Sequence, residues 1–200
     1  MKDLLLNSLM RNITRYCNYD EIKLKEIRYG LASLYLQLTK MIVIFLLSYI
    51  LGNFKTLLML MGFYSILRLT AYGVHAKKSI HCWIASLLIF IIIPIFCETI
   101  IINNNIKFIT SIICTLLIGI YAPADTEKRP LINKNKRTIF KIISLIISII
   151  YIVMIFTIKN NTLINCILFA LLLETIVILP LTYKVFGVEY NNYKKYKRKE

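Results

Sequence analysis

The chain has 200 residues, of which 58% are hydrophobic, and its mean hydropathy is +0.68. Soluble domains are about 45–50% apolar. Lys and Arg outnumber Asp and Glu by 25 to 10, although only 18% of the residues are charged. These values exclude an ordinary soluble enzyme, a disordered tail and a fibrous repeat, and they predict a polytopic membrane protein with its charge in the loops. Nucleic-acid binding is disfavoured because the basic residues lie in short clusters between apolar runs.

Residues 1–33 precede the first long apolar run and contain an amphipathic pattern. Apolar side chains recur at helical spacing between Leu5 and Cys17, with charged and amide side chains opposite them. This pattern predicts a helix that lies on the inner leaflet or packs on the protein's own loops. We expect no signal peptide, because the apolar run at 4–6 is too short for one.

Six apolar segments predict an all-α fold with six transmembrane helices. A helix needs about 20 apolar residues to cross a bilayer, with a range of about 17–25. The segments that meet or approach this length are residues 34–51, 56–69, 82–102, 106–121, 138–158 and 163–181. The second has only 14 residues, so we expect it to be tilted, partly re-entrant or surrounded by a thinned bilayer.

The basic residues indicate how the predicted helices cross the membrane. With the N-terminus in the cytoplasm, 22 of the 25 Lys and Arg residues fall on the cytoplasmic side, and only Lys55, Lys107 and Lys159 fall on the other. Because positive charge accumulates on the inner side, both termini are expected in the cytoplasm. The Tyr- and Lys-rich segment at 190–200 is expected to be disordered and to be held near anionic lipids by its charge.

Two carboxylates lie inside predicted spans, where a charged group is costly. Glu174 is in the middle of the sixth span, and Glu98 is near the outer end of the third. Each is expected to pair with a Ser, Tyr or Lys side chain of a neighbouring helix, or else to line a transport path. A small membrane transporter is therefore one alternative function, and a non-catalytic membrane partner is another.

The pattern of cysteines and histidines argues against a metal site and against a disulfide framework. The five cysteines are scattered and contain no CxxC pair, which argues against a disulfide framework and a structural zinc site. The two histidines have no nearby carboxylate that would complete a catalytic zinc site. We therefore expect no metal and no organic cofactor.

The chemically versatile side chains gather at residues 68–82, between the second and third spans. This stretch holds both histidines of the chain, a cysteine, a glycine and three cations. A Cys thiolate is a nucleophile, and a nearby imidazolium or Lys lowers the pKa of its thiol. Cys and His are the minimal set for acyl transfer. Cys82 is expected to open the third span, where helix N-terminal N–H groups stabilise a thiolate and can contribute to an oxyanion hole.

The spacing restricts which histidine can serve Cys82. His81 is its direct neighbour, and adjacent residues of a helix do not face each other. His75 is seven positions away, which is about 10.5 Å along a straight helix, whereas a catalytic hydrogen bond needs about 2.6–3.2 Å. A His75–Cys82 pair therefore requires the chain to leave helical geometry, for which Gly73 and the polar residues 77–79 are suited. Otherwise Cys82 is a lone interfacial cysteine beside a basic loop.

The pattern Arg68-x4-Gly73-x-His75-Ala-Lys-x4-Cys82 closely resembles the core motif of the accessory gene regulator B (AgrB) family. A second stretch, Tyr-Ala-Pro-Ala-Asp-Thr-Glu-Lys-Arg-Pro at 121–130, resembles that family's Tyr-Ala-Pro-Ala loop and the basic residues after it. The length, the six apolar segments and the basic loops also fit. The family consists of bacterial membrane cysteine endopeptidases that process quorum-sensing pro-peptides.

The resemblance implies that His75 and Cys82 are the catalytic pair and that Arg68 and Gly73 belong to the required motif. It implies that the Cys82 thiolate cleaves off the C-terminal part of a short pro-peptide and holds the remainder as a thioester. A Cys or Ser inside the bound peptide then closes a thiolactone or lactone ring. No Asp, Glu or Asn close to His75 in the sequence would orient its ring, so either a residue of another loop does so, with Asp125 as one candidate, or the site is a dyad.

The resemblance also implies the partners of the protein. The family's pro-peptides have an amphipathic N-terminal part and an acidic C-terminal tail, which the inner basic residues would attract. The cations expected to bind that tail are Lys77, Lys78, Lys128 and Arg129, whose other role would be to set topology and bind lipid. A homodimer is a further implication.

These expectations give an order of parts along the chain. Residues 1–33 are expected to form an amphipathic interfacial region, residues 34–182 a six-helix transmembrane catalytic domain, and residues 183–200 a basic cytoplasmic tail. The active site is expected at the cytoplasmic edge of a bacterial cell membrane.

Overall fold

The computed structural model describes residues 2–17, 19–74, 79–126 and 130–196, and only their backbone at 2, 79–81, 195 and 196. The secondary structure of these residues is α-helical, apart from isolated β-bridge residues, which include the pair Tyr72 and Ala124. The expected all-α fold is therefore confirmed. The chain divides into two compact units, Met1–Tyr49 and Ile50–Glu200.

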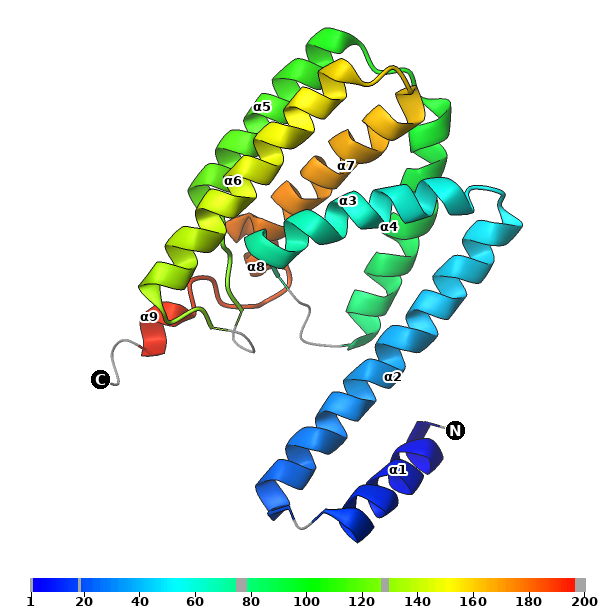
Figure 1. Ribbon diagram of the computed structural model, residues 1–200, viewed down its shortest axis with the longest axis vertical. Helices are drawn as coiled ribbons and strands as arrows, with labels where there is room; N and C mark the ends of the chain where they lie inside the picture. Colours follow the sequence, from blue (N-terminus) through cyan, green and yellow to red (C-terminus); the bar gives the residue numbers. More distant parts are fainter. Residues whose placement is uncertain (1, 18, 75–78, 127–129, 197–200) are drawn as a thin grey trace. The chain divides into compact units, whose positions relative to one another are not determined.

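The first unit contains α1 (Lys2–Tyr16) and nearly all of α2 (Glu21–Ile50). α1 runs back along the first part of α2 (Figure 1), and Arg28 Nη2 on α2 donates a hydrogen bond to Asn7 Oδ1 on α1 at 3.0 Å. The expected amphipathic helix is therefore present as α1. The first span begins earlier than residue 34, because no Gly–Pro or other helix-breaking pair separates Glu21 from the apolar run.

The apolar side chains of α1 are only partly covered. Leu6 is buried, whereas Leu4, Leu5 and Leu9 remain exposed. An amphipathic helix with exposed leucines is suited to lie at a membrane interface. The location of α1 at the membrane interface stays a prediction, and its exposed leucines are consistent with it.

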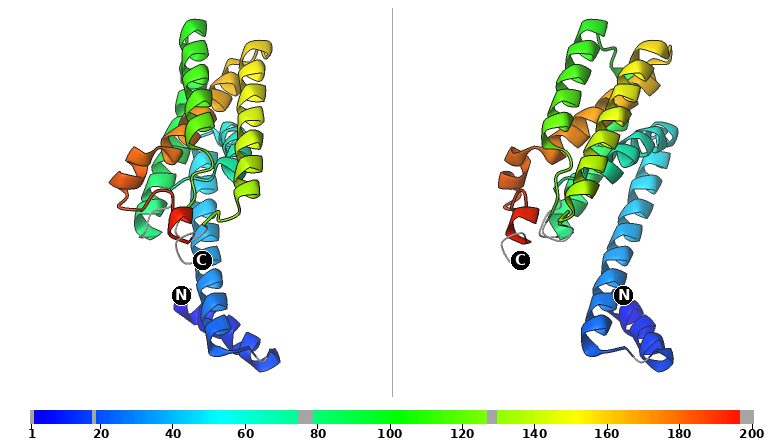
Figure 2. Two further views of the ribbon diagram at one scale, coloured as in Figure 1. Left: turned by 90° about the vertical axis from the view of Figure 1, so that its left-hand side faces the viewer. Right: turned by 60° about the vertical axis from the view of Figure 1, so that its left-hand side comes forward.

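The second unit contains the remaining helices (Figures 1 and 2). They are α3 (Phe54–Ala71), α4 (Ser79–Thr99), α5 (Asn104–Tyr121), α6 (Lys134–Thr157), α7 (Asn161–Ile178), α8 (Pro180–Val185) and α9 (Tyr193–Tyr196). In the described part of the chain, six helices, α2 to α7, are long and apolar enough to cross a membrane. The six expected spans are thereby confirmed as helices of suitable length and composition.

The second span is longer than its apolar run. α3 has 18 residues, as many as α5 and α7, because the helix also includes Phe54 and Lys55 at its start and Thr70 and Ala71 at its end. A helix of this length is about 27 Å long, close to the hydrocarbon thickness of about 30 Å. The expected length of 14 residues therefore underestimated this helix.

The core of the second unit forms around α7. This helix packs against α3, α4, α5, α6 and α8, and Figure 2 shows it among them. In its apolar window 61% of the residues are buried, whereas the other five spans reach 28% at most. The other spans expose many leucine and isoleucine side chains, as helices that face lipid do.

The sixth span ends earlier than residue 181. α7 stops at Ile178, and Pro180 is the first residue of the separate helix α8. Pro lacks the N–H that would continue the helical ladder. Carbonyl groups in the last turn of α7 are therefore left for other donors.

The described part of the C-terminal tail packs against the rest of the second unit. Tyr183 is buried, and its ring meets that of Tyr190 edge to face with the centroids 5.1 Å apart. The Tyr190 hydroxyl donates to the carbonyl oxygen of Tyr121 at 3.4 Å. Because aromatic burial and hydrogen bonds hold this segment, the expectation of disorder from residue 190 onward was wrong for residues 190–194.

Candidate active site

The end of α3 is shaped by two residues with positive φ. Tyr72 has a φ of 63°, and Gly73 has a φ of 118°. A Cβ atom at position 73 would lie 2.0 Å from Arg68 Nη1 and 2.9 Å from the carbonyl oxygen of Val177. Both the backbone conformation and the lack of space therefore require glycine at this position.

The segment after α3 pairs with the loop after α5. Tyr72 and Ala124 form a parallel bridge. The Ala124 N–H donates to the Ala71 carbonyl at 2.9 Å, and the Gly73 N–H donates to the Ala124 carbonyl at 2.8 Å. The two motif stretches found in the sequence, 68–82 and 121–130, therefore meet in space.

The Arg68 side chain is hydrogen-bonded to the turn that follows α3. Its Nη1 donates to the Tyr72 carbonyl, and its Nη2 donates to the Val74 carbonyl at 2.8 Å. The same Nη1 lies 3.6 Å from Oε1 of Glu174 on α7, which makes an ion pair. The Val74 N–H donates to the Val177 carbonyl of α7 at 2.9 Å. Arg68 and Gly73 thus lie in contact, as members of one small assembly.

Cys82 is the fourth residue of α4 and is half-buried. The first four N–H groups of a helix have no intrahelical acceptor and carry partial positive charge. Arg68 lies in the last turn of α3, and Cys82 lies in the first turn of the next helix, α4. Cys97, Cys114 and Cys166 are buried.

Five of the expected site residues lie outside the described residues. They are His75, Lys77, Lys78, Lys128 and Arg129. His75 falls between the end of α3 at Ala71 and the start of α4 at Ser79, and the described residues 72–74 are not helical. Residues 79–82 belong to α4, and the non-helical geometry expected between His75 and Cys82 stays a prediction.

Asp125 is a buried carboxylate in the loop after α5. Its Oδ2 accepts hydrogen bonds from the N–H groups of Tyr193, at 2.8 Å, and Leu131, at 3.3 Å. Burial raises the pKa of this carboxyl group, and the hydrogen bonds and Arg137 partly oppose that shift. The Tyr183 hydroxyl donates to the carbonyl oxygen of Ala124 at 2.8 Å. Asp125 thus anchors its own loop, and its action on His75 stays a prediction.

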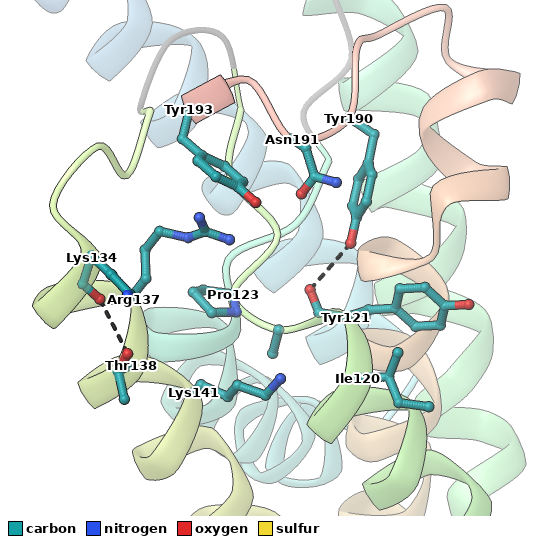
Figure 3. Close-up of a pocket in the computed structure, with 11 residues that line it drawn as sticks. Ile120, Tyr121, Pro123, Lys134, Arg137, Thr138, Lys141, Tyr190, Asn191 and Tyr193 are labelled. Carbon is teal, nitrogen blue, oxygen red and sulfur yellow. Dashed lines mark hydrogen bonds between the residues drawn. The ribbon is translucent and has the colours of Figure 1, made fainter. Parts of the chain in front are cut away.

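A pocket of about 480 Å³ opens beside this loop, between the ends of α5 and α6 and the C-terminal tail (Figure 3). Lys134, Arg137 and Lys141 of α6 line it together. The Arg137 guanidinium carbon lies 3.2 Å from the centroid of the Tyr193 ring. Three cations in one pocket favour an anionic ligand. Sequence reasoning missed these residues, although their spacing of three and four positions places them on one helix face.

The two intramembrane carboxylates have partners on neighbouring helices. Thr56 Oγ1 on α3 donates to Glu98 Oε1 on α4 at 2.5 Å, and Glu174 pairs with Arg68. Pairing between helices is one of the two expected roles, but the partners are Thr and Arg instead of Ser, Tyr or Lys. Among the described residues, no group of three or more His, Cys, Asp and Glu side chains could hold a metal ion.

Comparison with known proteins identifies the family. The sequence profile described as Accessory gene regulator B matches residues 5–178. A putative AgrB-like protein of Clostridium acetobutylicum is 31% identical over 186 residues, which cover 93% of this chain and 89% of the relative. The accessory gene regulator protein B of Staphylococcus aureus strain Newman is 32% identical, with 82% of this chain and 86% of the relative covered.

A putative AgrB-like protein of Listeria monocytogenes serotype 4a is 29% identical, over 88% of this chain and 87% of the relative. No solved structure matches the chain. The profile covers most of the chain, and the same residues form six helices that suit a membrane. The chain is therefore a multi-pass membrane protein that belongs to the accessory gene regulator B family and acts in accessory gene regulator quorum sensing.

Proposed function

We propose that the protein is a membrane cysteine endopeptidase that cleaves a short quorum-sensing pro-peptide and promotes its cyclisation. The main support is the meeting of two motif stretches, in which Gly73 is bonded to Ala124 of the loop after α5 and Arg68 holds the carbonyls of Tyr72 and Val74. This assembly ends at Val74, one peptide bond before His75. A tightly specified backbone next to a histidine is what a positioned general base requires.

In the proposed first step, His75 takes the proton from the Cys82 thiol. The thiolate attacks the carbonyl carbon of a peptide bond near the C-terminal part of the substrate, and the helix N-terminal N–H groups of α4 stabilise the oxyanion. The C–N bond then breaks, and the proton passes from His75 to the leaving amine. The N-terminal part of the peptide remains on Cys82 as a thioester.

In the second step, a thiol or hydroxyl group inside the bound peptide attacks the thioester carbonyl. Its proton passes to His75, a thiolactone or lactone ring forms, and the Cys82 thiolate leaves. Converting an amide into a thioester is unfavourable in water, so loss of the cleaved tail has to draw the first step forward. Water must be excluded from the thioester, for which a site at the membrane edge is suited.

The substrate's acidic tail is proposed to bind the cations around this site. The candidates from the sequence are Lys77, Lys78, Lys128 and Arg129. The pocket that Lys134, Arg137 and Lys141 line supports a wider basic surface, because it borders the loop at 121–123 that pairs with the motif. A tail with several carboxylates would be attracted by this charge over several ångströms.

The site is proposed to face the cytoplasm, with both termini on that side. The support is the uneven distribution of charge, with 22 of the 25 cations on one side of the six spans. Cys82 at the start of α4 and the pocket at the start of α6 lie on that basic side of the sequence pattern. The anionic lipids of the inner leaflet are then further partners of the basic residues.

The experiment that tests the proposal is a cleavage assay in membranes with the short peptide encoded beside this chain. We expect the wild-type protein to release the C-terminal fragment, and Cys82→Ala and His75→Ala to abolish its release because the nucleophile or its base is lost. Removing either member of such a pair costs about 10⁴-fold or more in rate. The measurement is the amount of fragment per amount of membrane-inserted protein.

Two matched variants control for loss of a thiol or an imidazole as such. Cys17→Ala removes the other half-buried cysteine, and His81→Ala removes the other histidine of the chain. Both are expected to retain cleavage. Full cleavage by the Cys82→Ala protein would contradict the proposed function.

A further inference from the structure

Glu174 is a carboxylate that the proposed reaction does not use. It lies inside α7, its side chain is fully buried, and charged residues at membrane depth are costly. Its Oε1 lies 3.6 Å from Arg68 Nη1, so the partner that offsets this cost is Arg68 on α3. The role of the buried Glu174 carboxylate is therefore sought in what Arg68 does.

Arg68 needs an anion nearby because the groups to which it donates hydrogen bonds carry no charge. Its guanidinium donates to the carbonyl groups of Tyr72 and Val74, and both acceptors are uncharged. Its side chain is only 19% exposed. A cation so far removed from water and bound to neutral carbonyls alone would bear a large desolvation cost. Glu174 supplies the negative charge that makes this arrangement stable.

α7 holds the same segment by a second contact. The Val177 carbonyl, freed where α7 ends before Pro180, accepts the N–H of Val74 at 2.9 Å. Positions 174 and 177 are three apart and therefore lie on one face of α7. This face holds the guanidinium through Glu174 and the backbone of the segment through Val177. Gly73 lies between them, without room for a Cβ atom.

We propose that Glu174 is a positioning residue that acts through Arg68 to fix the Tyr72–Val74 segment, and with it the start of the residues that carry His75. This inference rests on the proposed function, because His75 matters only if it serves Cys82. Val74 and His75 are consecutive, so their Cα atoms are about 3.8 Å apart, and a displacement of one moves the other. Glu174 itself does not touch the substrate.

The test compares Glu174→Gln with Glu98→Gln in the cleavage assay. Both variants neutralise a carboxylate inside a span without changing its size, but Glu98 accepts a hydrogen bond from Thr56, whereas Glu174 forms the ion pair with Arg68. We expect Glu174→Gln to lower kcat by about 100-fold, the cost of a displacement of about 1 Å. KM should stay within about twofold, because the substrate-binding cations are unchanged. Glu98→Gln should keep the wild-type kcat.

A double-mutant cycle separates positioning from general stability. If Glu174 acts through Arg68, the double variant Arg68→Gln/Glu174→Gln should be no slower than Arg68→Gln alone. It should also insert and fold better than either single variant, because no unpaired charge is left buried. Effects that multiply in the double variant would overturn the proposal, as would a wild-type kcat for Glu174→Gln.

Hydrogen exchange supplies a readout that does not depend on catalysis. The amides of Gly73 and Val74 are bonded to the Ala124 and Val177 carbonyls. Their protection should fall in Glu174→Gln and remain in Glu98→Gln. If the wild-type protein fails to cleave its peptide, the proposed function is wrong. The protection of these two amides still shows whether Glu174 holds the Tyr72–Val74 segment. Unchanged protection in Glu174→Gln would overturn the inference.

Discussion

Gly73 is the residue at which backbone conformation and packing restrict the chain most. Its φ of 118° lies where other residues are strained, and Arg68 Nη1 and the Val177 carbonyl occupy the place of a Cβ atom. A side chain here would push the guanidinium away from the carbonyls it holds. The glycine of the motif thus has a physical reason in this structure.

We expect Gly73→Ala to lower both stability and cleavage. The strained backbone costs about 1–3 kcal/mol, and the clash displaces Arg68. Gly62→Ala is the matched control, because nothing lies within 4 Å of a Cβ atom at that position of α3 and alanine favours a helix by about 0.5–1 kcal/mol. Thermal unfolding in detergent and cleavage in membranes measure the two effects. Equal behaviour of the two variants would contradict this role of Gly73.

At the residue scale, the sequence pointed to Arg68 and Gly73 through the resemblance and to Glu174 through its polarity. It did not reveal that Glu174 and Arg68 pair, because they are 106 positions apart and Arg68 lies at the edge of its apolar run. Contacts between distant residues depend on helix packing, which a hydropathy pattern does not contain. His75 and Cys82 remain a predicted pair.

At the scale of elements, the C-terminal tail and the loop after α5 stabilise each other. The Tyr193 N–H is bonded to Asp125, and the Tyr190 hydroxyl is bonded to the Tyr121 carbonyl. Burial of Tyr190 raises its pKa to about 12, so its hydroxyl remains a donor at neutral pH. The tail therefore supports the loop on which the end of α3 rests.

We expect deletion of residues 189–200 to lower the unfolding temperature and slow cleavage. Asp125 would lose the N–H of Tyr193, and an unsatisfied buried acceptor costs about 1–3 kcal/mol. Deletion of residues 197–200 alone is the control and should have little effect on either quantity. Circular dichroism during heating measures the first quantity and fragment release the second. An unchanged unfolding temperature in the longer deletion would show that the tail does not support the loop.

The helices were predictable because long apolar runs can hardly adopt another structure in a membrane. The ends of the helices were less predictable from the sequence. α3 and α6 continue into polar residues, since a helix ends where its backbone or a cap ends it and not where apolar residues stop. The Tyr72–Ala124 bridge was not predictable, because a single non-local contact leaves no periodic signal.

At the scale of the whole molecule, composition alone predicted a polytopic membrane protein, and the six long apolar helices of the described residues agree with it. The central place of α7 was not predicted, because nearly all faces of the six spans are apolar. One signal was present in the sequence. α7 carries Asn165, Glu174 and Thr175, all of which are buried, and polar side chains inside a span tend to face other helices.

The central claim is that Cys82 forms a thioester with the N-terminal part of the peptide. The most direct measurement is intact-mass spectrometry of the protein after reaction with a peptide whose internal Cys or Ser is replaced by Ala, so that the ring cannot close. We expect an adduct with the mass of the N-terminal fragment on Cys82, released by hydroxylamine and absent from Cys82→Ala. Release of the C-terminal fragment without any adduct, or an adduct that persists in Cys82→Ala, would contradict the claim.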